Sequence, residues 1–181
     1  IGYDSNKSYE VEKRTRDLTP KAKGEEFDKG GGADAFYYFL TRNLVPLIDE
    51  KFNVQDLPRS LYGHSFGGLF TLYAMLKNDG IFQNFFIASP SLWWGESEIL
   101  KQNVSEGKFK EKLKAKFVFL SVGELEKRKG KTDKAGTLKA SDLAQILKQS
   151  GINYHFELFK NETHGGVIPL NLKELLKYLK D

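Results

Sequence analysis

The sequence predicts an α/β fold in which a mainly parallel sheet is covered by helices on both faces, and three observations lead to this class. Short and wholly apolar runs, such as residues 85–88, have the composition of buried parallel strands. Longer stretches space their apolar residues at helical intervals. The two kinds of segment alternate along the chain, which is typical of parallel sheets built through right-handed crossovers. At 181 residues the chain fits one domain, 1–181.

The elements follow in order from this patterning. The first is a long helix at 33–52, which Asp34 is able to cap and in which Pro46 marks a kink or a break. After a short strand, Gly67 and Gly68 open a second apolar helix. Two further helices are predicted at 138–149 and 172–179, and strands are predicted at 60–62, 85–88, 116–122 and 154–159.

Composition excludes several classes of protein. Charged residues form 29% of the chain and hydrophobic residues 40%, which is typical of a globular protein rather than a disordered or membrane-spanning one. The net charge of +4 comes mostly from lysines scattered along the chain, with local density at 108–116 and 127–134. Apart from Phe109, no aromatic residue interleaves with these two stretches, which favours solvated surfaces over a nucleic-acid partner. The absence of cysteine excludes disulfides and thiol chemistry. The stretch 21–32, rich in Lys, Glu and Gly, is expected to be a mobile loop.

A candidate nucleophile lies between a predicted strand and a predicted helix. Residues 63–67 read Gly-His-Ser-Phe-Gly and match G-x-S-x-G, the pattern that places a serine on a sharp turn from strand to helix. The hydroxyl of Ser65 then points outward over the sheet. The backbone N–H of Phe66 faces the oxyanion that forms when Ser65 attacks a carbonyl. The competing interpretation is a glycine-rich turn with an idle serine.

A serine nucleophile needs a base, and the chain offers three histidines. His64 adjoins Ser65, so the turn directs its side chain away, toward packing or a hydrogen bond. His155 lies within a predicted strand, where a surface position is expected. His164 lies in a loop after the last strand, and the order Ser, acid, His along the chain favours it as the base.

The acid should follow the predicted strand 116–122, at the carboxyl edge of the sheet. The residues beyond that strand include Glu124 and Glu126, either of which can hold the imidazole tautomer, and Asp133 is a more distant candidate. The residues alone do not separate Glu124 from Glu126. Each can also be a solvated loop residue.

Several segments together resemble the esterase-D-like family of α/β-hydrolase esterases, and most of all its branch of siderophore (enterobactin/salmochelin-type) trilactone esterases. The segments are GHSFGGLF at 63–70, SPSLWWG at 89–95, SVGELE at 121–126 and THGG at 163–166, with IGYDSN at 1–6 and RTRDLTP at 14–20. The resemblance implies a Ser65 nucleophile and a His164 base. It favours Glu126 as the acid over Glu124, because the family places glutamate three residues after a glycine.

The resemblance also implies what the chain binds and what it lacks. Arg14 and Arg16 are expected near an anionic small-molecule ester, with a salt bridge to Asp17 or a neighbour as the alternative. Trp93 and Trp94 follow a buried strand, and we expect one to wall the pocket and core packing to occupy the other. No metal or cofactor is required. The family fold has further N-terminal strands, so the chain is expected to be N-terminally incomplete and to lack the second oxyanion donor.

Other functions stay open at this point. A catalytically silent binding module and an acyltransferase are compatible with the same residues. A phosphate-binding loop at 130–132 is disfavoured, because six residues rather than four separate Gly123 from Gly130. Nothing in the chain fixes the oligomeric state, and both cytoplasmic and periplasmic locations fit a start without a leader pattern.

Overall fold

The computed structural model describes residues 2–6, 9–109, 113–126 and 134–178. Its helices are α1 (Val11–Leu18), α2 (Ala33–Phe39), α3 (Val45–Phe52), α4 (Phe66–Lys77), α5 (Glu98–Ser105), α6 (Ala140–Gln149) and α7 (Val167–Tyr178). The 3-10 segments are η1 (Glu25–Phe27) and η3 (Trp94–Ser97), and η2 (Leu40–Leu44) is a π-helical segment. The strands are β1 (Ser60–His64), β2 (Asn84–Ala88), β3 (Phe117–Gly123) and β4 (Tyr154–Phe159).

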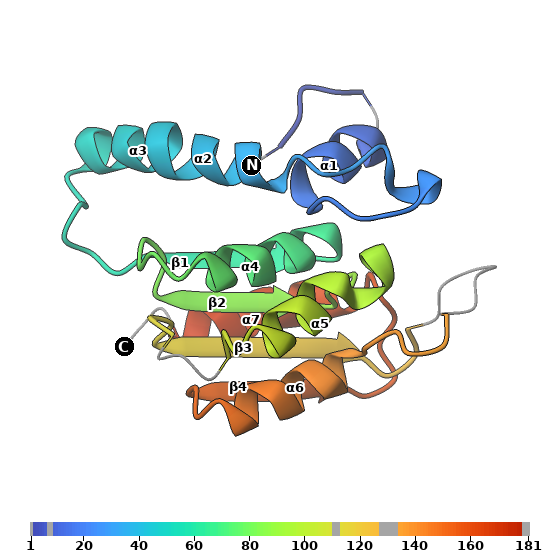
Figure 1. Cartoon of the computed structure of the whole chain (residues 1–181). Helices are drawn as coiled ribbons and strands as arrows, with labels where there is room; N and C mark the ends of the chain where they lie inside the picture. Colours follow the sequence, from blue (N-terminus) through green and yellow to red (C-terminus); the bar gives the residue numbers. More distant parts are fainter. Residues whose placement is uncertain (1, 7–8, 110–112, 127–133, 179–181) are drawn as a thin grey trace.

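The four strands form one parallel sheet in the order β1-β2-β3-β4 (Figure 1). Helix α4 packs on β1 and β2, and α6 packs on β3 and β4, while α7 packs on β2 and β3 from behind the sheet in the view of Figure 1. The central strands are the most apolar, and Ile87 and Leu120 are fully buried. The prediction of a parallel sheet covered on both faces is confirmed.

The predicted helix 33–52 is continuous in space but not regular. Helix α2 passes through the π-helical segment η2 into α3, and Pro46 lies in the first turn of α3. Because proline has no amide hydrogen, the regular hydrogen-bond ladder is interrupted there. The proposed capping role of Asp34 is wrong: Gly32 is the N-cap, and the Asp34 carboxylate instead accepts a hydrogen bond from Tyr73 and pairs with Lys77.

Other elements differ from the prediction at identifiable points. Helices α1 and α5 were not predicted, and α7 begins at Val167, five residues before the predicted start. The stretch 21–32, expected to be a mobile loop, contains the 3-10 segment η1 and is anchored to the core. Its Phe27 side chain is buried against Trp94, with ring centroids 4.9 Å apart.

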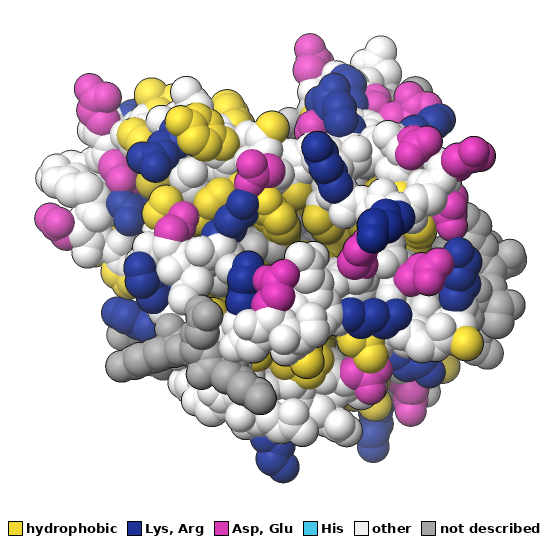
Figure 2. Space-filling model, viewed as in Figure 1, with side chains coloured by type: hydrophobic (Ala, Val, Ile, Leu, Met, Phe, Trp, Pro, Cys, Tyr) yellow, Lys and Arg dark blue, Asp and Glu magenta, His cyan; other side chains and the backbone are white. Residues whose placement is uncertain are grey.

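The surface combines interspersed charges with one apolar region. Lys, Arg, Asp and Glu side chains alternate over the face seen in Figure 2, whereas hydrophobic side chains gather near the helical segment α2–α3. The exposed hydrophobic residues of that segment are Tyr38, Phe39, Leu47, Ile48 and Phe52. Among the described residues, no helix combines the length and apolarity needed to cross a membrane.

A groove of about 800 Å³ runs between α2–α3 and strand β1, which pairs only with β2 among the described strands. One end of the groove reaches Arg14, His64 and Gly67, and the other reaches Asp49 and Arg59. The groove therefore opens beside the carboxyl end of β1. The carboxyl ends of all four strands lie at this same edge of the sheet, where parallel sheets place their ligands.

Candidate active site

The serine of the G-x-S-x-G segment lies on a strained turn between β1 and α4. Ser65 has φ 61° and ψ −118°, a conformation that L-residues rarely adopt. Backbone atoms approach closely at two neighbouring positions, and both positions are occupied by glycine. A Cβ at Gly63 would lie 2.0 Å from the carbonyl oxygen of Gly67, and one at Gly68 would lie 2.7 Å from that of Ala88, whereas a Cβ at Gly67 would meet nothing within 4 Å. The sequence therefore folds into this turn because Gly63 and Gly68 let three backbone segments approach one another.

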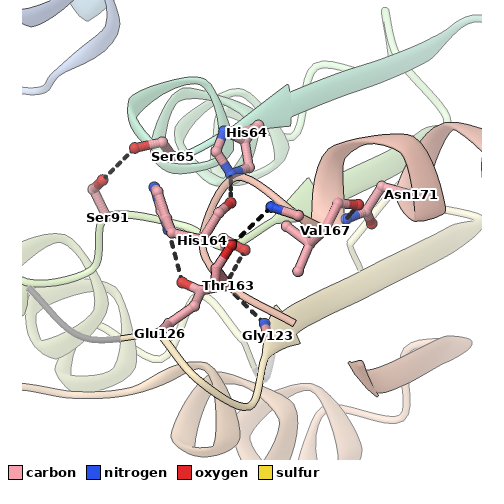
Figure 3. A network of polar contacts seen from close by, with 11 residues as sticks. His64, Ser65, Ser91, Gly123, Glu126, Thr163, His164, Val167 and Asn171 are labelled. Carbon is pink, nitrogen blue, oxygen red and sulfur yellow. Dashed lines mark hydrogen bonds and ion pairs between the residues drawn. The ribbon is translucent and has the colours of Figure 1, made fainter. Parts of the chain in front are cut away.

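The Ser65 side chain is half-buried and has one hydroxyl neighbour. Its Oγ lies 3.3 Å from Oγ of Ser91, and the Ser91 amide donates to the Ser65 carbonyl oxygen at 3.1 Å (Figure 3). Between Ser65 and His164, both of them described, no hydrogen bond is formed. Catalytic hydrogen bonds often close only when substrate is bound, so this geometry is compatible with a nucleophile and base pair.

The predicted base and the predicted acid are in direct contact. Nδ1 of His164 lies 2.7 Å from Oε2 of Glu126. Figure 3 shows the other ring nitrogen of His164 directed toward Ser65. An ionised carboxylate accepts a hydrogen bond from a protonated Nδ1. This leaves Nε2 unprotonated and able to accept the proton of the Ser65 hydroxyl.

The second carboxylate oxygen of Glu126 is also fully engaged. Oε1 accepts a hydrogen bond from Ser89 Oγ at 2.5 Å and another from the Gly123 amide at 2.7 Å. Burial raises the pKa of Glu126, but the hydrogen bonds from His164, Ser89 and Gly123 outweigh it, so its net pKa is lowered. The carboxylate is therefore charged at neutral pH.

The alternative acids and the alternative base have other partners. Glu124 is exposed, and its Oε2 accepts a hydrogen bond from the Asn161 amide at 3.0 Å, which ties two loops together. His155 lies on the exposed side of β4, 3.0 Å from the Glu157 carboxylate. Asp133 lies outside the described residues, as do residues 130–132 of the disfavoured phosphate-binding loop.

His64 lies next to the candidate nucleophile in sequence but contacts the candidate base. Its Nε2 donates to the backbone carbonyl oxygen of His164 at 2.7 Å, and the two imidazole rings lie 4.5 Å apart. Burial lowers the pKa of His64, and the neighbouring His164 lowers it further. His64 is thus held as a neutral donor that ties the base loop to the serine turn.

The oxyanion candidate lies at the start of a helix. Helix α4 begins at Phe66, so the Phe66 amide has no acceptor within the helix, and the positive end of the helix dipole lies at the same place. This position suits a developing negative charge beside Ser65.

The two tryptophans occupy different environments. Trp94 is 4% exposed, donates from Nε1 to the Pro20 carbonyl oxygen at 2.9 Å and packs on Phe27. Trp93 is half-buried, and its ring centroid lies 5.7 Å from that of Phe66. Trp94 also packs on Phe66, with ring centroids 5.6 Å apart, and is a core residue. Trp93 packs on the same Phe66 ring but is the more exposed of the two.

The two arginines also differ. Arg16 is exposed and forms a two-point ion pair with Asp17, with contacts of 2.6 and 2.9 Å. Arg14 is half-buried, lies 5.9 Å from the Tyr9 ring centroid and reaches the His64 carbonyl oxygen at 3.5 Å. Arg14 lies beside the serine turn, whereas the guanidinium of Arg16 is already occupied.

Two serines of the site were not predicted. Ser89 contacts the acid and Ser91 contacts the nucleophile, and both follow β2 at its carboxyl end. Their position directly after a predicted buried strand is the signal that could have identified them, because Ser65, Glu126 and His164 also lie beyond the carboxyl ends of strands.

A family model described as "Putative esterase" matches residues 5–166. The ferri-bacillibactin esterase BesA of Bacillus subtilis is 28% identical over 98% of this chain and 65% of its own length. The apo-salmochelin esterase of Escherichia coli is 29% identical over 97% of this chain and 58% of its own length. The chain thus spans about three fifths of these curated relatives.

Solved structures give the same result. The BES protein from Bacillus cereus superposes with a TM-score of 0.77 at 31% identity, over 96% of this chain and 65% of that one. Siderophore hydrolase EstA from Aspergillus nidulans superposes with a TM-score of 0.79 at 26% identity, over 98% of this chain and 69% of that one. Since the family model covers most of the chain and the fold agrees, the chain belongs to this esterase family of α/β-hydrolase type.

Proposed function

We propose that the chain is the catalytic part of a serine carboxylesterase. Ser65 Oγ attacks the ester carbonyl carbon while His164 accepts the hydroxyl proton, and His164 then gives this proton to the leaving alkoxide. Water hydrolyses the resulting acyl-enzyme by the same two steps and releases the carboxylic acid. The observation that carries the proposal is the 2.7 Å contact between His164 Nδ1 and Glu126 Oε2 at the same sheet edge as Ser65.

The surrounding charges support this division of roles. Glu126 is held ionised, so it stabilises the imidazolium that forms when His164 accepts a proton. The Phe66 amide at the start of α4 stabilises the tetrahedral oxyanion. In the resting site Ser65 Oγ lies near Ser91, and rotation of its side chain turns the hydroxyl toward His164.

Turnover of p-nitrophenyl acetate by the whole chain tests the proposal. We expect measurable hydrolysis by the wild type and a loss of at least about 10³-fold in Ser65→Ala and in His164→Ala, because each removes a member of one cooperative unit. Added methanol separates the alternatives: an acyltransferase forms the methyl ester as its main product. A folded wild-type protein without turnover above that of Ser65→Ala would favour the silent binding module.

For the substrate class, we infer a siderophore-type ester that carries acidic aromatic groups. The relatives described above include a ferri-bacillibactin esterase and an apo-salmochelin esterase, which supports this class. The position of Arg14 beside the serine turn supports a role in attracting an anionic group, and the half-buried ring of Trp93 supports stacking on an aromatic ring. A catecholate trilactone should be turned over with a higher kcat/KM than a short p-nitrophenyl ester or a feruloyl ester.

A further inference from the structure

Ser89 connects the end of β2 to the acid. It is the first residue after β2, and its side chain is 2% exposed. Its amide donates to the Ser121 carbonyl oxygen at 2.8 Å, which continues the pairing of β2 with β3, and its Oγ donates to Glu126 Oε1 at 2.5 Å. The sheet hydrogen bond holds the Ser89 backbone in place, and the buried side chain donates its hydroxyl proton to Glu126.

The conformation of Ser89 is unfavourable for a residue with a side chain. Its φ is 44°, in the left-handed region that glycine adopts most easily. A non-glycine residue held there costs on the order of 1 kcal/mol. A role for the hydroxyl accounts for a serine at this position, where glycine would relieve the strain.

The two donors to Oε1 determine how the Glu126 carboxylate is turned. Ser89 Oγ and the Gly123 amide approach this oxygen from different strands, and together they fix the plane of the carboxylate. Oε2 is then left as the acceptor for His164 Nδ1. Without the Ser89 hydroxyl, Oε1 keeps the Gly123 amide as its donor, and the orientation of the carboxylate is held less firmly.

We propose that Ser89 is a positioning residue, which orients the Glu126 carboxylate so that Oε2 faces His164. This inference rests on the proposed esterase function, because it assigns a role in the same reaction. The lowered pKa of Glu126, to which the Ser89 hydrogen bond contributes, agrees with it. The effect of Ser89 on the reaction should therefore pass entirely through Glu126.

A double-mutant cycle separates this role from a purely structural one. Ser89→Gly removes the hydroxyl and relieves the positive φ, so it should fold with an unchanged or raised Tm; Ser89→Ala is the second variant. We expect each to lower kcat/KM for p-nitrophenyl acetate about tenfold to hundredfold, which corresponds to the loss of a hydrogen bond to a charged group. In a Glu126→Ala background, Ser89→Gly should cause no further loss.

The matched control is Ser97→Gly. Ser97 is also a buried serine with positive φ, 66°, and its hydroxyl bonds to the Leu92 carbonyl oxygen and the Leu138 amide instead of the acid. Ser97→Gly should leave kcat/KM within about twofold of the wild type, because it keeps the acid in place.

The proton resonance of His164 Nδ1–H gives a readout that does not depend on turnover. This resonance lies far downfield when the proton is held by a carboxylate, and Ser89→Gly should shift or broaden it whereas Ser97→Gly should not. An unchanged resonance, or losses that multiply independently in the double mutant, would overturn the role of Ser89. An inactive wild type with an intact resonance would instead overturn the esterase function.

Discussion

His64 and His164 are one hundred residues apart in the sequence, yet Nε2 of His64 lies 2.7 Å from the backbone oxygen of His164. The residue that precedes the proposed nucleophile therefore holds the loop that carries the proposed base. This contact connects the carboxyl ends of the two outermost strands, β1 and β4.

The pKa of His64 predicts how stability depends on pH. Burial lowers this pKa below the ordinary imidazole value of about 6.5, so the unfolded chain binds the proton more readily than the folded one. The stability that depends on neutral His64 is therefore fully present above about pH 6.5 and is lost as the pH falls below it. Urea unfolding between pH 7.5 and 5 should show a smaller decrease in His64→Gln than in the wild type. Parallel decreases in the two proteins would rule out His64 as the source.

The glycines of the serine turn should respond unequally to an added methyl group. Gly63→Ala and Gly68→Ala place a Cβ 2.0 and 2.7 Å from backbone oxygens, and each should lower the free energy of unfolding by about 2 kcal/mol or more. Gly67→Ala meets open space within α4 and should be neutral or stabilising by about 1 kcal/mol. Equal thermal midpoints for all three variants would contradict the packing described for this turn.

Substitution of Trp94 should mainly lower stability, whereas substitution of Trp93 should mainly weaken the binding of aromatic substrates. Trp94→Ala should cost about 3–5 kcal/mol of unfolding free energy, because it empties a buried site and removes the hydrogen bond to Pro20. Trp93→Ala should cost less than about 1 kcal/mol and raise KM for aromatic esters more than for acetyl esters. Calorimetry and steady-state kinetics on both variants check this, and the reverse assignment of effects would count against it.

The arginines give a paired test of anion recognition. Arg14→Ala should lower kcat/KM for an ester with an anionic acyl group about tenfold more than for a matched neutral ester, because Arg14 lies beside the serine turn. Arg16→Ala is the control, since its guanidinium already pairs with Asp17. Equal effects of Arg14→Ala on both esters would remove Arg14 from the substrate site.

Much of the site could be predicted because parallel strands end at a common edge. All four strands were predicted, the two central ones from their apolar runs, and Ser65, Glu126 and His164 each lie beyond the end of one of them. The contact between Glu126 and His164 required the fold, since Glu124 lies even closer to the end of β3 in sequence. Only the structure shows that Glu124 faces Asn161 instead.

The features that were not predicted leave little trace in apolar periodicity. Helix α1 (Val11–Leu18) is mostly charged and buries only Leu18, so it lacks an apolar stripe. The early start of α7 was hidden by Pro169, which usually ends a helix but is tolerated in a first turn. The positive φ of Ser89 depends on tertiary contacts, and no pattern in one sequence encodes it.

The most direct test of the catalytic assignment is covalent labelling with a fluorophosphonate, followed by peptide mass mapping. The account predicts one adduct, on Ser65, formed by the wild type and absent from Ser65→Ala, with slower labelling in His164→Ala and Glu126→Ala. Ser91→Ala should still be labelled on Ser65, because Ser91 is a neighbour of the nucleophile and not a substitute for it. An adduct on Ser91 or another residue, or no adduct on a folded wild-type chain, would contradict the assignment of Ser65 as the nucleophile.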